Sequence, residues 1–310
     1  MINIFHWFLL GLYTIVTIIP YYFYVGITCF INPKKRNILK YKGKPVIPIM
    51  ILSLTLVVYF ICIFTLSRWY VQKLKINYLA NDILESTKIL ESEPSEVINT
   101  DEYTPVTTNK YASVSFLSVD FDDLLKKNSD TVAWIKVNNT NVNYAVVQGE
   151  DNEFYLHHDF NKYNNMGGWI YGDYRDDFEY FGNNTIIYGH NLINRTMFGS
   201  LIWCEKDSWY LNEENQYIKL STPSSNTIWK IFSIYEIKPQ IDYLKTYFET
   251  DNEHLEFLNT LKNRSIYNFG DELTTNDKIL TLSTCSDDGL RRAVIHAKMV
   301  KVEYREKGTS

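Results

Sequence analysis

The chain has 310 residues, of which 45% are hydrophobic and 22% charged, and its formal net charge is −5. Residues 1–75 contain nine Lys or Arg and no acidic residue, whereas residues 76–310 contain 22 basic and 36 acidic residues, a formal charge of −14. This division excludes a wholly soluble protein, and nucleic acid is not an expected partner of the acidic part.

Two stretches without charged residues predict two N-terminal transmembrane helices, at residues 2–31 and 46–66. Both are long enough, because about 20 apolar residues in a helix cross the bilayer core. No basic residue precedes the first stretch, which is also too long for the apolar core of a signal peptide, so both spans are expected to be retained. A hairpin or an interfacial segment is the alternative for the first stretch, which has no predicted role.

The connecting loop, residues 32–44, holds six Lys or Arg and predicts the orientation of the chain. Cytoplasmic loops are enriched in basic residues, so this loop is expected to face the cytoplasm. Both termini then lie outside. We therefore interpret residues 1–67 as a two-span membrane anchor and expect residues 68–310 on the extracytoplasmic side of the cell membrane.

Residues 68–112 are interpreted as a juxtamembrane helix and a linker. Five mostly apolar residues between positions 76 and 90 recur at steps of three and four, which is typical of one buried helix face. Residues 91–110 are polar, contain Pro94 and Pro105 and show no sustained period, as expected for a linker.

Residues 113–310 are predicted to form one mostly β domain with a few peripheral helices. A short helix is expected at residues 120–127, capped by Ser118 or Asp120. Eight runs are rich in Val, Ile, Thr and aromatic residues and are separated by Asn, Gly and Asp. They are residues 131–137, 144–147, 168–171, 184–188, 217–220, 227–237, 278–283 and 293–303.

A helical insertion is expected between the sixth and seventh of these runs, where Leu255, Leu258 and Leu261 recur at threes. Many short strands with few helices favour a β-barrel or a β-sandwich.

Two of the four cysteines, Cys29 and Cys62, fall in the apolar spans, so Cys204 and Cys285 could form at most one disulfide. Cys285 ends an apolar run and precedes the turn-forming sequence Ser-Asp-Asp-Gly. A thiol at a strand end is accessible to a substrate, although a structural cysteine is the plainer interpretation of any single residue.

His190 also follows an apolar run, and Arg292 lies at the start of the last one. If these strand ends meet, Cys285 supplies a nucleophile, His190 a general acid and base, and Arg292 a partner for an oxyanion. Taken singly, the histidine could cap a turn and the arginine could be a surface charge beside Arg291. Adjacent His157 and His158 do not predict a metal site, because chain neighbours seldom point at one ion.

The sequence Thr-Leu-Ser-Thr-Cys at residues 281–285 resembles the active-site signature of sortases, and its Leu-Ser pair resembles class B. Further segments similar to class B sortases follow in the expected order over about residues 120–302. They are residues 134–137, 143–149, 151–159, 172–175, 187–191, 197–199 and 264–267.

This resemblance implies an eight-stranded β-barrel in which Cys285 is the nucleophile, His190 the family histidine and Arg292 the family arginine. Strand parity places Arg291 on the opposite face from Arg292. Ser283 and Thr284 beside the cysteine, and Tyr188 beside the histidine, are predicted to contact substrate.

The resemblance also implies a cysteine transpeptidase that cleaves the C-terminal sorting signal of a secreted protein after a Thr. An amine of a cell-wall precursor would then take the acyl group, anchoring surface proteins to peptidoglycan. The expected partners are secreted proteins with a sorting signal, the peptidoglycan precursor or another amine acceptor, and the membrane. No metal and no other cofactor is expected. A thiol hydrolase, a silent membrane-anchored binding module and a pilin polymerase that uses a lysine acceptor remain alternatives.

Overall fold

The computed structural model describes residues 40–41, 44–91, 111, 113–285 and 291–305. The chain forms two compact units, residues 1–71 and 72–310. The first unit contains the short antiparallel pair β1 (Lys40–Tyr41) and β2 (Lys44–Pro45), followed by the start of helix α3 (Val46–Ser86).

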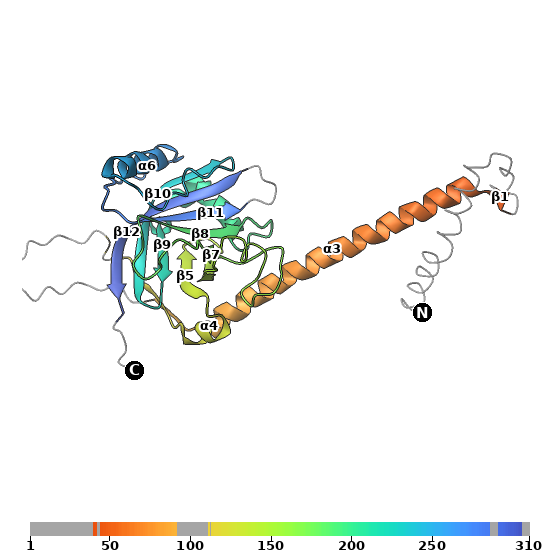
Figure 1. The fold of residues 1–310 in the computed structure, drawn as a ribbon, viewed down its shortest axis with the longest axis horizontal. Coiled ribbons are helices and arrows are strands. Elements are labelled where there is room, and N and C mark those ends of the chain that lie inside the picture. Colours follow the sequence, from red (N-terminus) through yellow and green to blue (C-terminus); the bar gives the residue numbers. More distant parts are fainter. Residues whose placement is uncertain (1–39, 42–43, 92–110, 112, 286–290, 306–310) are drawn as a thin grey trace, which may run out of the picture. The chain divides into compact units, whose positions relative to one another are not determined.

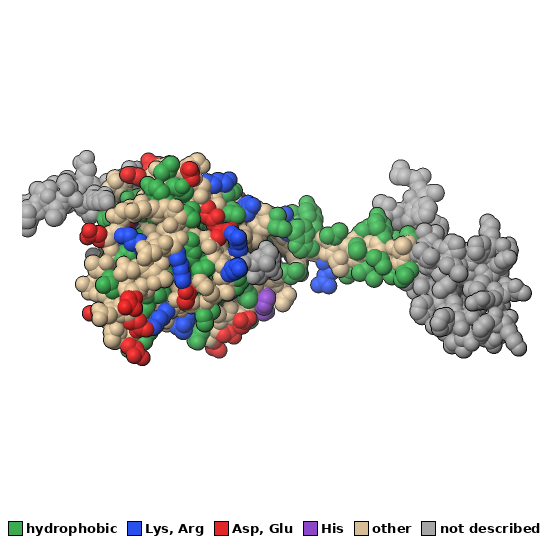
Figure 2. All heavy atoms as spheres, turned by 90° about the horizontal axis from the view of Figure 1, so that it is seen from above, with side chains coloured by type: hydrophobic (Ala, Val, Ile, Leu, Met, Phe, Trp, Pro, Cys, Tyr) green, Lys and Arg blue, Asp and Glu red, His purple; other side chains and the backbone are tan. Residues whose placement is uncertain are grey.

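Helix α3 contains the second predicted span and continues as the predicted juxtamembrane helix, so the two form a single element. Among the described residues, Leu54–Ser86 is the one helix long and apolar enough to cross a membrane. Its apolar side chains include Leu54 at 65% and Phe64 at 61% exposure, and hydrophobic side chains gather on this helix in Figure 2. An exposed apolar surface of this kind is unfavourable in water, and a lipid bilayer would cover it. The first predicted span lies outside the described residues.

The last turns of α3 pack on the domain that follows. Of the predicted apolar stripe, Ile76 and Ile83 are each 1% exposed within the main hydrophobic cluster, and Leu79 is partly buried against it. Ala80, which the stripe did not include, is also buried. The stripe does not reach Leu90, because the helix ends at Ser86. Leu90 lies instead in β3 (Ile89–Glu91), which pairs with β4 (Leu117–Val119). Of the predicted linker, residues 92–110 lie outside the described residues.

Eight strands close into a barrel in the order β10-β12-β11-β8-β7-β6-β5-β9 (Figure 1). The strands are β5 (Thr131–Val137), β6 (Asn143–Val147), β7 (Tyr171–Gly172), β8 (Asn184–His190), β9 (Tyr217–Ser221), β10 (Ser225–Ile237), β11 (Ile279–Cys285) and β12 (Arg292–Tyr304). Neighbours are antiparallel except for the parallel pairs β11–β8 and β6–β7. Each of the eight predicted runs overlaps one strand. Because the sheet closes on itself, the fold is a β-barrel and not a β-sandwich.

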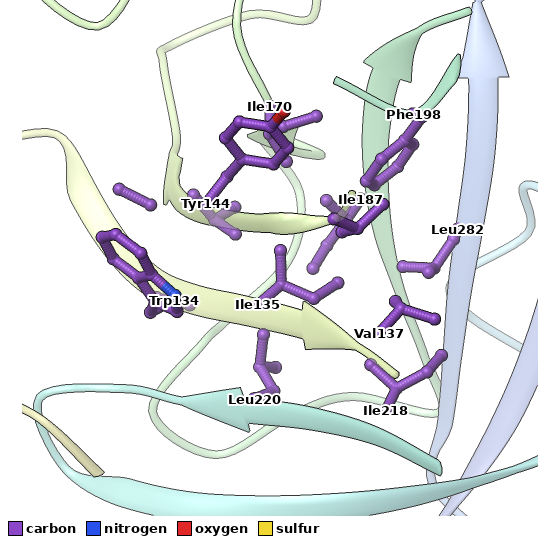
Figure 3. Close-up of a cluster of buried hydrophobic side chains, with 14 of the residues drawn as sticks. Trp134, Ile135, Val137, Tyr144, Ile170, Ile187, Phe198, Ile218, Leu220 and Leu282 are labelled. Carbon is purple, nitrogen blue, oxygen red and sulfur yellow. The ribbon is translucent and has the colours of Figure 1, made fainter. Parts of the chain in front are cut away.

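The barrel interior is filled by large apolar side chains from opposite walls. Ile135 of β5, Ile187 of β8, Ile218 of β9 and Leu282 of β11 are all fully buried (Figure 3). In general, β-branched and aromatic residues suit a pleated, buried surface, which explains why the sequence pattern located these strands. This packing fixes the ends of β8 and β11, where the candidate site lies.

The run at residues 168–171 is displaced relative to the strand it predicts, since β7 is only Tyr171–Gly172. Gly168 has φ +51°, a left-handed conformation that interrupts an extended strand. Trp169 is nevertheless fully buried, and its Nε1 donates to the carbonyl oxygen of Ala145 at 2.9 Å.

The predicted short helix is α4 (Asp122–Lys127), where the side chain of Asp120 accepts a hydrogen bond from the backbone N–H of Asp122 at 3.1 Å. The N-cap position is occupied by Phe121, which makes no side-chain cap hydrogen bond, so the prediction of Ser118 or Asp120 as the cap is wrong. Ser118 lies in β4. The remaining short helices precede β9. They are η3 (Gly199–Glu205), α5 (Asp207–Tyr210) and η4 (Glu213–Asn215).

The helical insertion is α6 (Asp251–Asn263), which packs against the outside of the barrel beside β10. Its predicted apolar stripe is wrong at one position. Leu258 and Leu261 are fully buried, but Leu255 is 39% exposed and His254 is buried in its place. A helical period of 3.6 residues puts positions 254, 258 and 261 on one face, whereas the two consecutive steps of three from 255 to 261 drift off that face.

Candidate active site

The ends of β8 and β11 bring the predicted cysteine and histidine together. These strands pair in parallel and in register from Ile279 opposite Asn184 to Cys285 opposite His190. Paired strands lie about 4.8 Å apart, so the backbones of Cys285 and His190 are immediate neighbours at one rim of the barrel. The two residues are 95 positions apart in the chain, so the sequence alone could not show that they are neighbours. The pairing of β8 with β11 in the barrel brings them together.

Strand β12 brings the predicted arginine to the other side of the cysteine strand. β11 and β12 pair antiparallel up to Ser283 opposite Val294, and two more residues along this register lead to Cys285 and Arg292. Beyond Ser283 a side chain replaces the regular ladder, because the backbone N–H of Ala293 donates to Thr284 Oγ1 at 2.9 Å. The three predicted residues therefore occupy the ends of three adjacent strands.

The two neighbouring arginines point to opposite faces, as strand parity predicts. Arg292 is partly buried, and its Nη1 donates to the hydroxyl of Tyr243 at 3.3 Å. The Arg291 side chain is 68% exposed and pairs with Glu236 at 3.1 Å. Of the two, Arg292 is thus the one held inside the site.

The imidazole of His190 is buried, with 5% exposure, and its Nε2 lies 2.8 Å from the carbonyl oxygen of Leu156. A carbonyl oxygen can only accept a hydrogen bond, so Nε2 must carry a proton. In a neutral imidazole this leaves Nδ1 as the basic nitrogen. The contact therefore defines which atom of His190 can take a proton.

Ser283 and Thr284 are each 1% exposed, so both face the protein interior more than solvent. Ser283 Oγ lies 3.0 Å from the hydroxyl of Tyr243, the same hydroxyl that accepts from Arg292. Tyr243 lies in an irregular segment between β10 and α6, where strand and helix periodicity gave no signal for it. It joins Ser283 to Arg292.

Tyr188 is 7% exposed and donates its hydroxyl to Asp173 at 2.8 Å. Burial and the negative charge of Asp173 raise the pKa of the Tyr188 phenol, so Tyr188 is neutral at physiological pH. Burial opposes ionisation of Asp173 itself, but hydrogen bonds from Arg175 and Tyr188 outweigh it and hold the pKa of Asp173 below its ordinary value. Arg175 makes two contacts of 2.7 Å to this carboxylate.

Asp176 belongs to the same loop and behaves differently. Burial raises the pKa of Asp176 to about 7, and the neighbouring charge of Asp173 adds to the shift. A hydrogen bond of 2.6 Å from the backbone N–H of Ile186 offsets the effect only in part. This carboxyl group therefore titrates near neutral pH beside strand β8.

Among the residues described by the structure, no three His, Cys, Asp or Glu residues are grouped so that they could hold a metal ion. His158 stacks on Phe154 with ring centroids 4.1 Å apart, and Asp159 accepts backbone N–H groups of its own turn. Cys204 is free and fully buried, so no disulfide joins it to Cys285. Burial raises the pKa of the Cys204 thiol well above its ordinary value, which makes it unreactive.

Residues 135–300, from β5 into β12, match the Sortase domain family. Sortase B of Staphylococcus aureus (strain NCTC 8325 / PS 47) is 36% identical over 185 residues, which cover 59% of this chain and 75% of the relative. The solved S. aureus sortase B–substrate complex is 36% identical with a TM-score of 0.55, over 58% of this chain and 84% of that one. A sortase B complexed with triglycine is 34% identical with a TM-score of 0.56, over 60% and 86% of the two chains.

The eight-stranded mixed barrel and these similarities define a cysteine transpeptidase. The chain belongs to the sortase family, and its similarity to sortase B proteins assigns it to class B.

Proposed function

We propose that this enzyme cleaves the C-terminal sorting signal of a secreted protein after a Thr and transfers the acyl group to an amine of a cell-wall precursor. Surface proteins would thereby be anchored to peptidoglycan. Family membership supports the general reaction. The observation that carries the residue roles is the register of β8 and β11, which sets Cys285 beside His190, with Arg292 on the next strand.

In the first half-reaction, the Cys285 thiolate attacks the carbonyl carbon of the signal's Thr. A carbon–sulfur bond forms, and the carbonyl oxygen becomes an oxyanion that the Arg292 guanidinium stabilises. His190 then donates a proton to the leaving amine as the peptide bond breaks, and a thioester remains on Cys285. Nδ1 is the nitrogen proposed to exchange this proton, since Nε2 is bonded to Leu156.

In the second half-reaction, an amine attacks the thioester, the carbon–sulfur bond breaks and a new peptide bond forms. His190 accepts the proton that the amine loses, which restores the Cys285 thiolate and the His190 imidazolium. A similar sortase B forms a complex with triglycine. We therefore propose a glycine-type amino group of a wall precursor as the acceptor, in place of a lysine side chain.

Ser283, Thr284 and Tyr188 are proposed to shape the substrate wall beside the thiol. Because all three side chains are buried, they would act mainly by positioning the groups to which they are hydrogen-bonded. Ser283 bonds to Tyr243, and Tyr188 bonds to Asp173. Thr284 bonds to the backbone at the start of β12.

Membrane attachment fits this reaction. We propose that residues 1–67 form a two-span anchor, residues 68–112 a juxtamembrane helix and linker, and residues 113–310 an extracytoplasmic catalytic domain. The apolar helix Leu54–Ser86 supports one of these spans. Both proposed substrates are held at the membrane, so an enzyme confined to the same surface meets them at a higher effective concentration.

The test is to incubate the full chain in lipid nanodiscs with a sorting-peptide library and either triglycine or a lysine peptide, and to identify products by mass spectrometry. Cleavage after Thr and a product joined to triglycine are expected. Hydrolysis without an amine adduct would favour a thiol hydrolase, and joining only to lysine would favour pilin polymerisation. Cleavage that persists in Cys285→Ala would refute the assignment of Cys285.

A further inference from the structure

Gly168 lies where no other residue fits without displacing backbone. Its φ of +51° is disfavoured by L side chains. A Cβ at this position would lie 2.5 Å from the carbonyl oxygen of Tyr155 and 2.6 Å from that of Leu156. Both are backbone atoms, so neither can move aside by changing a side-chain rotamer.

The Leu156 carbonyl oxygen is the same atom that accepts the hydrogen bond from His190 Nε2. The close approach at Gly168 therefore occurs at a backbone group that contacts the His190 ring directly. Removing space at Gly168 would push on the acceptor that determines the His190 tautomer.

Backbone hydrogen bonds hold the two segments together around this contact. Trp169 N donates to Tyr155 O at 2.9 Å, and Asn165 N donates to His157 O at 2.8 Å. Leu156 lies between Tyr155 and His157, and Gly168 lies next to Trp169. The segment is tied on both sides, so a Cβ at Gly168 could be accommodated only by moving the Leu156 carbonyl or breaking these bonds.

We propose that Gly168 is a positioning residue for His190. By leaving room for the Leu156 carbonyl, it keeps the proton of the neutral ring on Nε2 and makes Nδ1 the base in the reaction. The inference rests on the proposed function of His190. It adds a residue that touches neither substrate nor the reacting atoms.

The test compares Gly168→Ala with Gly270→Ala in the full chain in nanodiscs. Gly270 is a matched control because its φ is +77° and nothing lies within 4 Å of a Cβ built there. Both variants carry the backbone cost of a positive φ, but only Gly168→Ala crowds the Leu156 carbonyl. The measurements are kcat and KM for transpeptidation and the ¹⁵N NMR signals of the His190 ring, assigned by their loss in His190→Gln.

In the wild type we expect neutral His190 to carry its proton on Nε2. Gly168→Ala is expected to lower kcat by about 10²-fold, because a misplacement of about 1 Å can cost that much, with little change in KM. Its His190 nitrogen signals should show loss of the single Nε2–H form. Gly270→Ala should keep both the wild-type kcat and the wild-type signals.

Unchanged kcat and His190 signals in folded Gly168→Ala would overturn the proposal, and so would a wild-type proton on Nδ1. If Ala at position 168 prevents folding, Gly168→Asn replaces it, since Asn tolerates positive φ yet still carries a Cβ. Unchanged kcat and His190 signals in Gly168→Asn would then overturn the proposal, as would a wild-type proton on Nδ1. A wild-type enzyme that joins no peptide to any amine would instead count against the proposed function, while the NMR signals would still report the His190 tautomer.

Discussion

At the scale of single residues, the site separates two adjacent arginines by orientation alone. Arg292 donates to Tyr243, whereas Arg291 pairs with Glu236 at the surface. Strand alternation predicted that the two side chains point to opposite faces, whereas the choice of Arg292 for the site came from the resemblance to sortases. Tyr243 could not be predicted in the same way, because it lies in an irregular segment without strand or helix periodicity. Only the folded structure shows its contacts with Ser283 and Arg292.

Replacing each arginine by lysine tests the proposed oxyanion partner. Arg292→Lys keeps the charge but loses the planar group held by Tyr243, so kcat is expected to fall by about 10²-fold. Arg291→Lys is the matched control and should stay within about twofold, because its ion pair is exposed. Steady-state transpeptidation assays measure both. Equal losses in the two variants would remove the special role of Arg292.

The raised pKa of Asp176 predicts a pH dependence of stability. Its pKa is about 7 in the folded protein against an ordinary value of 3.8, so the folded state binds the extra proton between about pH 4 and 7. The stabilisation is complete below about pH 4, and it is lost as pH rises through about 7.

Asp176→Asn removes this titration and can still accept from the N–H of Ile186. The variant should therefore be more stable than the wild type at pH 7.5, by on the order of 1–3 kcal/mol, and the difference should shrink toward pH 4.5. Thermal unfolding at a series of pH values measures it, with the exposed neighbour Asp177→Asn as control. A stability difference that does not change with pH would show that Asp176 is ionised throughout.

At the scale of elements, the strands were easier to predict than their ends or their partners. β5 coincides with its predicted run, because seven residues rich in Val, Ile and Trp fill a barrel wall. Periodicity failed at residues 168–171, where the first residue, Gly168, has a positive φ and only Tyr171 lies in a strand. It carries no information on which strands pair, so the parallel contact of β8 with β11 emerged only from the structure.

Helix α6 offers a direct test of its corrected phase. Leu258→Ala removes a fully buried side chain and is expected to lower the free energy of unfolding by about 2–5 kcal/mol. Leu255→Ala makes the same chemical change at a partly exposed position and should cost less than about 1 kcal/mol. Denaturant titration of both variants compares the two positions. A larger effect at Leu255 would favour the stripe predicted at steps of three.

At the scale of the whole molecule, the charge distribution predicts an anchor and a separate acidic domain. The exposed apolar surface of Leu54–Ser86 agrees with one span, and the sortase family accounts for the domain. The basic loop at residues 32–44 is the basis on which we propose the side of the membrane, since cytoplasmic loops are enriched in basic residues.

Protease added to intact cells tests this orientation. Residues 113–310 should be cleaved without lysis, because we place them outside the membrane. In contrast, a cysteine introduced into the loop at residues 32–44 should react with a membrane-impermeant thiol reagent only in permeabilised cells. A domain that is protected until lysis would reverse the proposed topology.

The central claim is that Cys285 carries the acyl group, and trapping the intermediate tests it most directly. The full chain is mixed with a sorting peptide in the absence of an amine, quenched in acid, digested and analysed by mass spectrometry. We expect the N-terminal part of the peptide, ending in Thr, to be attached to the fragment containing Cys285 and released by hydroxylamine. An acyl group on any other residue, or peptide cleavage by Cys285→Ala, would contradict the account.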